Sequence, residues 1–168
     1  MVQGRVETVH NELLKVPKTL KQVTLWVHPE GRVVGAIFLR QHSVHHAGQE
    51  QPLEALNRPE PFIVIQRAEP NEVRFYNRKS IIRIEYEGKD YQVATAIKPL
   101  ACQLQLMDGA YIHGLIHEPL HPNKSRLLDY LNKPEDAFIK MFVDGMTVLI
   151  NKSYIIHVQV DNLEDDDE

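Results

Sequence analysis

The sequence predicts a mostly β protein made of two tandem, small, five-stranded and strongly bent antiparallel barrel-like modules with short helices. Three observations predict it. The chain repeats itself once, both copies alternate apolar and polar residues as strands do, and each copy carries a glycine inside its second expected strand. With 168 residues, 43% of them hydrophobic, the chain is long enough to bury a sizeable core.

The internal repeat is the strongest of these signals. One copy begins VTLWVHPEGRVVGAIFL and the other LQLMDGAYIHGLIH, and each later contains a Leu-Asn-x-Pro segment followed by apolar stretches. Gly35 matches Gly114 at an offset of 79, and Asn57 matches Asn132 at an offset of 75. The offset drifts only across predicted turns, where insertions are tolerated. We therefore interpret the chain as two copies of one module.

Each copy is expected to contain five strands. Residues 32–40 and 111–117 form the second strand, and Gly35 and Gly114 within it indicate a bend or a close backbone approach. Asn77 and Asn151 lie at the turn before the last strand, where asparagine tolerates left-handed backbone. Strand alternation predicts a core made of Leu25, Val27, Phe62, Val64, Ile82, Ile84, Leu104, Leu106, Ile139, Ile156 and Val158.

The two modules account for residues 20–86 and 102–160. Residues 1–19 are expected to hold a short helix over 8–16, residues 87–101 a connecting hairpin or strand, and residues 161–168 a disordered acidic tail. Two more short helices are expected, over 52–56 and over 126–131, the second capped by Ser125.

Charge and composition narrow the class of protein. The net charge is −4, but residues 1–86 carry +3 and the remainder −7, with five acids in the last five residues. A nearly neutral body argues against strong nonspecific binding to polyanions. No apolar run is long enough for a membrane span and the N-terminal residues lack an apolar signal region, so we expect a cytoplasmic protein without a membrane partner. A single cysteine excludes an internal disulfide.

No motif specifies a reaction, so the sequence predicts neither an enzyme nor a cofactor. His42, His45 and His46 share an expected loop, but no Asp or Cys lies nearby to complete a metal site. His113, His117 and His121 recur every four residues, which on a strand places them too far apart for one ion. Cys102 is expected to be a packed structural thiol.

The run PKTLKQVTLWVHPEGRVVGAIFL resembles the opening of an Sm-like domain, and LQLMDGAYIHGLI and VRFYNRKSIIRI resemble that family's turn and closing strands. The resemblance implies a small bent β-barrel and an RNA-binding loop. About 20 residues, 41–61 and 118–137, separate the second and third strands here, and Asn57 and Asn132 do not directly precede the third strand as in the family. The closing turns read Asn-Arg and Asn-Lys where the family carries Arg-Gly. The resemblance therefore predicts the fold more firmly than the RNA site.

The sequence favours a non-catalytic protein-interaction or assembly module that binds a protein partner or itself. The alternative is an RNA-binding Sm-like protein, and a metal-dependent enzyme that uses the histidines is a third hypothesis. Basic residues interleaved with an aromatic ring are typical of nucleic-acid surfaces. The candidate interaction residues are Arg74, Tyr76, Arg78, Lys79, Asn57 and Asn132.

Overall fold

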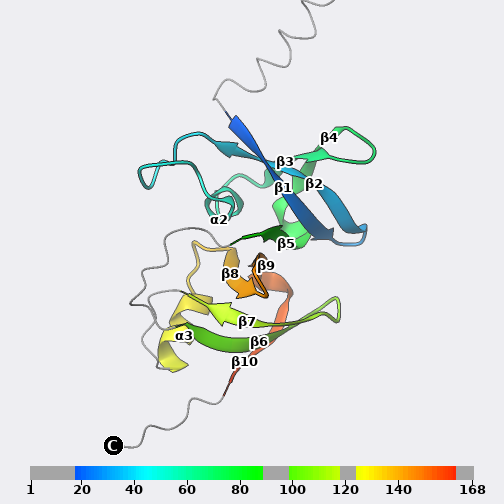
Figure 1. The fold of residues 1–168 in the computed structure, drawn as a ribbon. Helices are drawn as coiled ribbons and strands as arrows, with labels where there is room; N and C mark the ends of the chain where they lie inside the picture. The colour runs from blue at the N-terminus through cyan, green and yellow to red at the C-terminus, as the bar shows by residue number, and fades with distance from the viewer. Residues whose placement is uncertain (1–17, 89–98, 118–123, 162–168) are drawn as a thin grey trace, which may run out of the picture.

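The structure is a computed structural model that describes residues 18–88, 99–117 and 124–161, with 124–126 described by backbone only. The expected N-terminal helix, most of the connecting segment and nearly all of the acidic tail lie outside the described residues. The described part is mostly β, as predicted (Figure 1).

Ten strands and two short α-helices make up the described chain. The first half contains β1 (Lys18–Val27), β2 (Gly31–Arg40), α2 (Pro52–Leu56), β3 (Phe62–Arg67), β4 (Val73–Asn77) and β5 (Ile81–Glu87). The second half contains β6 (Leu100–Leu106), β7 (Tyr111–Ile116), α3 (Lys124–Leu131), β8 (Phe138–Val143), β9 (Met146–Asn151) and β10 (Ile155–Val160). Single 3₁₀ turns, η1 (Arg78–Ser80) and η2 (Lys152–Tyr154), lead into β5 and β10.

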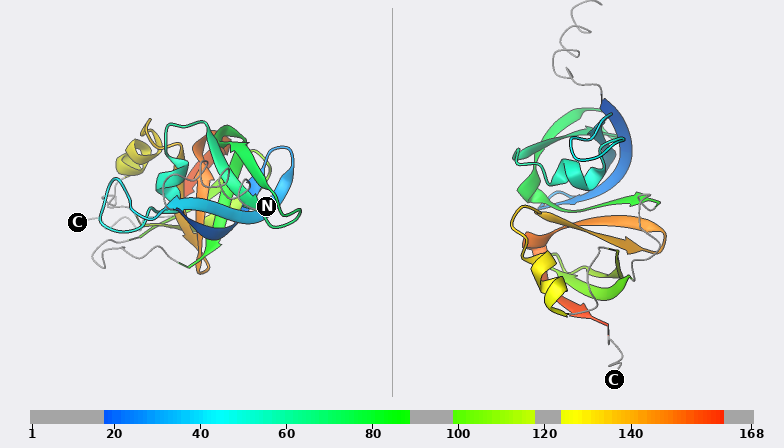
Figure 2. Two further views of the ribbon diagram at one scale, coloured as in Figure 1. Left: turned by 90° about the horizontal axis from the view of Figure 1, so that it is seen from above. Right: turned by 90° about the vertical axis from the view of Figure 1, so that its left-hand side faces the viewer.

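The strands form one open antiparallel sheet with the order β10-β6-β7-β8-β9-β5-β1-β2-β3-β4. We predicted two tandem barrel-like modules that pack as a pair. In the structure their strands lie in one open sheet, because β5 pairs with β9 along five residue pairs and joins the halves. Figure 1 shows β5 and β9 in the middle of the molecule, and Figure 2 shows the halves stacked above and below them. The edge strands β4 and β10 stand at the two ends of the strand order.

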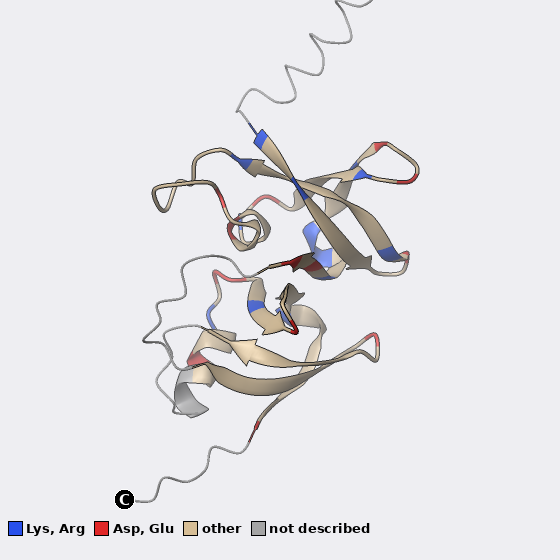
Figure 3. Cartoon of the chain, in the orientation of Figure 1, with Lys and Arg blue, Asp and Glu red and all other residues tan. Residues whose placement is uncertain are grey.

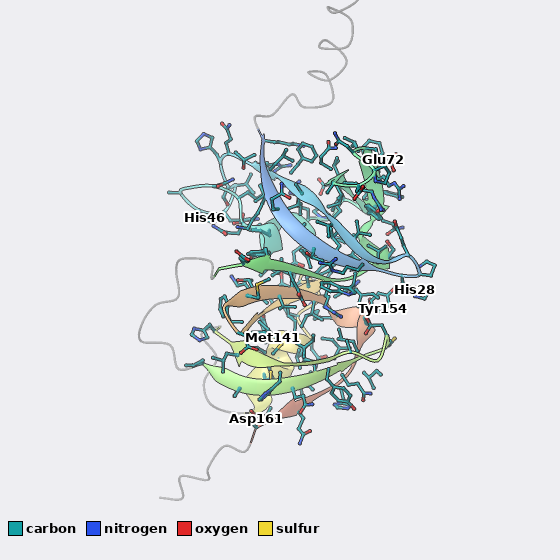
Figure 4. The ribbon with its side chains drawn as sticks, turned by 45° about the vertical axis from the view of Figure 1, so that its right-hand side comes forward. His28, His46, Glu72, Met141, Tyr154 and Asp161 are labelled. Carbon is teal, nitrogen blue, oxygen red and sulfur yellow. The ribbon has the colours of Figure 1, made fainter. Side chains whose placement is uncertain are left out.

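The core consists of two apolar clusters that share the central strands. Phe138 and Leu149 of the second half belong to the cluster of the first half, and Ile82 of the first half belongs to the cluster of the second. Strands that are covered on both faces bury successive residues instead of alternate ones, as β5 and β9 do. Each half therefore completes the core of the other. His28 and Tyr154, whose ring centroids lie 6.4 Å apart, meet where the halves join (Figure 4).

The predicted core is correct for seven of its eleven residues: Leu25, Val27, Ile82, Ile84, Leu104, Leu106 and Ile139 are buried. The other four lie on or beside the two edge strands. Phe62 and Ile156 are exposed, and Val64 and Val158 are only partly buried. Alternation identifies which side chains share a face, but it does not say whether another element covers that face. That is why these four predictions were wrong.

The predicted close approach at Gly35 and Gly114 is confirmed. A Cβ atom would lie 2.6 Å from the Gln66 carbonyl oxygen at Gly35, and 2.5 Å from the Phe142 carbonyl oxygen at Gly114. The prediction of left-handed backbone at Asn77 and Asn151 is wrong, because these residues have φ of −64° and −69°.

These asparagines cap the 3₁₀ turns instead. The side-chain oxygen of Asn77 accepts a hydrogen bond of 3.0 Å from the Lys79 N–H, and Asn151 does the same with Ser153. The turn is thus built by side-chain hydrogen bonding rather than by unusual backbone.

Candidate interaction surface

The predicted basic and aromatic group does not form one open surface. The Arg74 guanidinium contacts two carboxylates, with Nε 2.6 Å from Glu72 Oε1 and Nη1 3.2 Å from Glu30 Oε1. The Tyr76 ring is buried, and its hydroxyl donates to Glu30 Oε2 at 3.2 Å and accepts from Arg67 Nη1 at 2.8 Å. The loop between β3 and β4 carries only acids, and the basic residues lie on the strands that flank it (Figure 3). Arg74 is therefore neutralised, and Tyr76 is not free to stack on a base.

Glu30 is the centre of this network. Burial acts to raise the pKa of the Glu30 carboxyl, but the hydrogen bonds from Arg67 and Tyr76, together with the positive charges of Arg67 and Arg74, hold that pKa below its ordinary value. Arg67 also forms an ion pair with Glu30. The network ties β3 and β4 to the turn between β1 and β2, which is a structural role.

Arg78 and Lys79 lie apart from Arg74, on η1, beside Lys152 of η2. These three cations line a hollow of about 290 Å³, to which Asp136 contributes a carboxylate. Burial is the main cause that lowers the pKa of Lys152, and its Nζ donates to the Lys133 carbonyl oxygen at 2.7 Å. The hollow is thus a weakly basic surface shared by both halves.

Asn57 and Asn132, matched in the repeat, have different surroundings. The backbone N–H of each bonds to the carbonyl oxygen four residues earlier, at the end of its short helix. The Asn57 side chain also donates to the Phe138 carbonyl oxygen at 3.2 Å and accepts from the Phe138 N–H at 2.8 Å. The Asn132 side chain is exposed and makes no hydrogen bond to the described residues. The structure therefore gives Asn57 a role in joining the halves.

The most distinctive open surface is one the sequence prediction missed. Phe62, Val73 and Phe75 project from the same side of β3 and β4, where Phe62 is 56% exposed and Phe75 is 62% exposed. We call these three residues the β4 face. Their repeat counterparts include Phe138 and Leu149, which are 1% and 0% exposed because they pack on the first half. Exposure depends on which element covers the strand, and no residue pattern in the sequence distinguishes the two sets.

The histidines and the cysteine show no shared site among the described residues. No group of three or more His, Cys, Asp or Glu side chains gathers there, and His121 lies outside the described range. His46 contacts Glu54, and His113 lies 2.7 Å from Asp161. Cys102 is buried, and burial together with Asp161 raises the pKa of its thiol to about 11. The thiol is therefore protonated near neutral pH and weakly nucleophilic.

Comparisons with protein-family models, curated proteins and solved structures found no match to this chain. Across the described segments, no helix combines the length and apolar composition needed to cross a membrane.

Proposed function

We propose that this chain is a non-catalytic protein-interaction and assembly module, built from a duplicated Sm-like unit, that binds through its β4 face. The observation that carries the proposal is the apolar β4 face, which lies on a strand with no second neighbour among the described strands. Its counterpart in the second half is buried in a strand-to-strand junction. An edge strand offers free backbone donors and acceptors to another chain, and apolar side chains beside it add burial energy.

Matching hydrogen bonds support the duplicated unit. In each half the strand order is fifth, first, second, third, fourth, and the same backbone contacts recur at repeat-related residues. The matched pairs are His28 N–H to Ser80 O at 2.9 Å with Met107 N–H to Tyr154 O at 2.8 Å, and Arg78 N–H to Pro61 O at 2.7 Å with Lys152 N–H to Ala137 O at 2.9 Å.

A photo-crosslinking amino acid at position 75, in cells that naturally express the protein, tests the proposal. We expect crosslinks to protein, and we expect the same probe at Leu20, an exposed residue of β1, to give far fewer. Crosslinks at both positions to the same extent, or none at position 75, would contradict binding through the β4 face.

RNA binding is the second candidate function, and the hollow lined by Arg78, Lys79 and Lys152 favours it. Phosphate contacts weaken steeply with salt. If RNA binds there, Arg78→Ala with Lys79→Ala should reduce the affinity and flatten its salt dependence. A Phe75→Asp variant separates the candidates, because it removes protein binding through the β4 face and leaves the hollow unchanged.

A further inference from the structure

A hollow of about 220 Å³ lies beside the β4 face, between β2 and β3. These strands pair only where Gly35–Ile37 meets Ile65–Arg67, although both strands continue beyond these residues. Phe62 and Val64 of β3 line the hollow, and they lie on the same side of the sheet as Phe75 of β4. A partner that covers the β4 face therefore also meets this hollow.

Three cations line the hollow, and they are Lys18, Arg40 and Arg58. Lys18 and Arg40 are opposite members of the β1–β2 register, and Figure 3 shows the start of β1 and the end of β2 in blue. Both side chains are half-buried. Among the described residues, neither the Lys18 ammonium nor the Arg40 guanidinium has a hydrogen-bond or ion-pair partner. The hollow thus contains two cations that the described chain does not neutralise.

A carboxylate of the chain itself shows what this cluster can hold. Glu50 is 3% exposed and forms an ion pair with Arg58. Arg58 Nε donates to Glu50 Oε2 at 3.0 Å, and the backbone N–H of Arg40 donates to Glu50 Oε1 at 3.0 Å. Glu50 therefore neutralises Arg58 and leaves the charges of Lys18 and Arg40 in excess.

The remaining charge matches a single carboxylate. Among the described residues that line the hollow, the exposed Glu60 is the only acid, so the three cations exceed Glu50 and Glu60 by one charge. Burial is the main cause that lowers the pKa of Lys18, and the nearby charges of Arg58 and Arg40 lower it further. An added carboxylate would offset this repulsion between like charges.

The rest of the lining favours a protein segment over a nucleic acid. A nucleic acid brings a row of phosphates, which a row of cations must neutralise. A protein segment can place one acid among apolar residues, and such a segment fits a hollow whose other lining side chains are apolar. These side chains are Ile37, Phe38, Ala55, Phe62, Ile63 and Val64.

We propose that the partner of the β4 face is a protein segment of apolar residues with one acid, whose carboxylate enters the hollow and binds Lys18 and Arg40. This inference rests on the proposed function and names the chemistry of its partner. Apolar residues of the segment cover Phe62 and Phe75, which supplies burial energy. The carboxylate accepts charge-assisted hydrogen bonds, which fix the position of the segment and discriminate against partners without an acid.

A displayed library of random peptides, selected on the purified full-length chain, tests the proposal. Peptides that bind the wild type but not Phe75→Asp are ligands of the β4 face. We expect these peptides to share an Asp or Glu at a fixed distance from apolar residues. Replacing that acid by its amide should weaken binding by about tenfold. Ligands of the β4 face that carry no acid would overturn the inference.

Substitutions in the chain locate the bound carboxylate. Lys18→Gln and Arg40→Gln should each weaken the acidic peptides by about tenfold and leave the amide peptides unchanged. Arg40→Lys keeps the charge and should lose less affinity than Arg40→Gln. Arg32→Gln, at an exposed position at the other end of β2, is the matched control and should bind like the wild type. If both glutamine variants prefer the acid as strongly as the wild type does, the proposal is wrong.

The titration of Lys18 provides a readout other than affinity. A bound carboxylate offsets the charges of Arg58 and Arg40, so the acidic peptide should raise the pKa of Lys18 and the amide peptide should not. Nuclear magnetic resonance of the lysine side chain measures this shift. An unchanged Lys18 titration in the saturated complex would place the carboxylate elsewhere and overturn the inference.

Competition separates two other occupants of the hollow. A peptide of residues 161–168 is acidic but has only one large apolar residue, so it should not displace the selected peptides. Displacement by it would assign the hollow to the acidic end of this chain. Displacement by a uridine oligonucleotide would assign the hollow to phosphate. Either result overturns the proposal.

Failure of this inference differs from failure of the proposed function. Protein crosslinks from the probe at position 75, together with selected peptides that lack an acid or with no selected peptide, overturn the inference and leave the proposed function intact. The absence of crosslinks at position 75 overturns the proposed function, and the inference fails with it.

Discussion

Asn57 connects the halves through one side-chain amide, and its repeat partner Asn132 supplies a natural control. Asn57→Ala leaves the N–H and carbonyl oxygen of Phe138 without their partner, so we expect unfolding free energy to fall by about 1–3 kcal/mol. Asn132→Ala, at an exposed position, should change it by less than about 0.5 kcal/mol. Urea unfolding of dilute protein measures both. Equal losses would contradict the role given to Asn57.

Glycine is required at positions 35 and 114 because a side chain would not fit there, and not because the backbone needs a conformation that only glycine adopts. An alanine Cβ would meet a carbonyl oxygen at 2.6 Å or 2.5 Å, and a backbone atom cannot move aside as a flexible side chain can. Gly35→Ala and Gly114→Ala should each cost about 1–3 kcal/mol of stability in urea unfolding. Val34→Ala, at an exposed position next to Gly35, is the control. Two alanine variants as stable as this control would show that the strands separate easily.

Glu30 makes stability depend on pH at its end of the sheet. Its folded-state pKa is lowered, so its contribution is present above the ordinary pKa near 4.5 and is lost as pH falls toward the folded value. We expect Glu30→Gln to flatten the fall in thermal midpoint below about pH 4.5. Glu60→Gln, whose carboxylate is exposed and makes no ion pair with described residues, should keep the wild-type profile. Identical profiles for all three proteins would exclude a role for the Glu30 network.

At the scale of elements, strands β8 and β9 contribute side chains to both apolar clusters, whereas the repeat-related strands β3 and β4 contribute to the first cluster alone. Phe138→Ala opens a cavity in the first cluster and should cost about 3–5 kcal/mol. The repeat-related Phe62→Ala removes an exposed ring and should change the stability of the monomer by less than about 0.5 kcal/mol. Chemical unfolding of both variants measures the contrast. Similar costs would mean that Phe62 is buried in the monomer.

The elements were largely predictable from sequence, because their signals are local. Alternation predicted the strands, and the two short helices expected over 52–56 and 126–131 correspond to α2 and α3. The strand-interior glycines correctly indicated close backbone contact. The pairing of β5 with β9 was not predictable, since it depends on how one half meets the other. The candidate interaction residues were mispredicted for the same reason. From the sequence, Arg74 is a cation that could bind a phosphate, but the fold places Glu30 beside it.

Across the whole molecule, shared clusters make the two halves thermodynamically dependent. Trp26, the single tryptophan, lies on β1 of the first half yet packs against the cluster of the second. The Arg83 guanidinium lies 3.9 Å from the centre of its ring. The fluorescence of Trp26 therefore reports on the contact between the halves, while far-ultraviolet circular dichroism reports on all strands. We expect the two signals to follow one cooperative urea transition.

A substitution in the second half distinguishes one folding unit from two independent ones. Phe138→Ala should shift the Trp26 fluorescence midpoint and the circular dichroism midpoint together, although Trp26 belongs to the other half, because Phe138 completes the first cluster and β9 holds β5. Independent halves would instead give two transitions, with Trp26 losing its environment while roughly half of the strand signal remains. The exposed-site control, Phe62→Ala, should leave both midpoints in place. Coincident shifts would establish that the two halves unfold as a single cooperative unit.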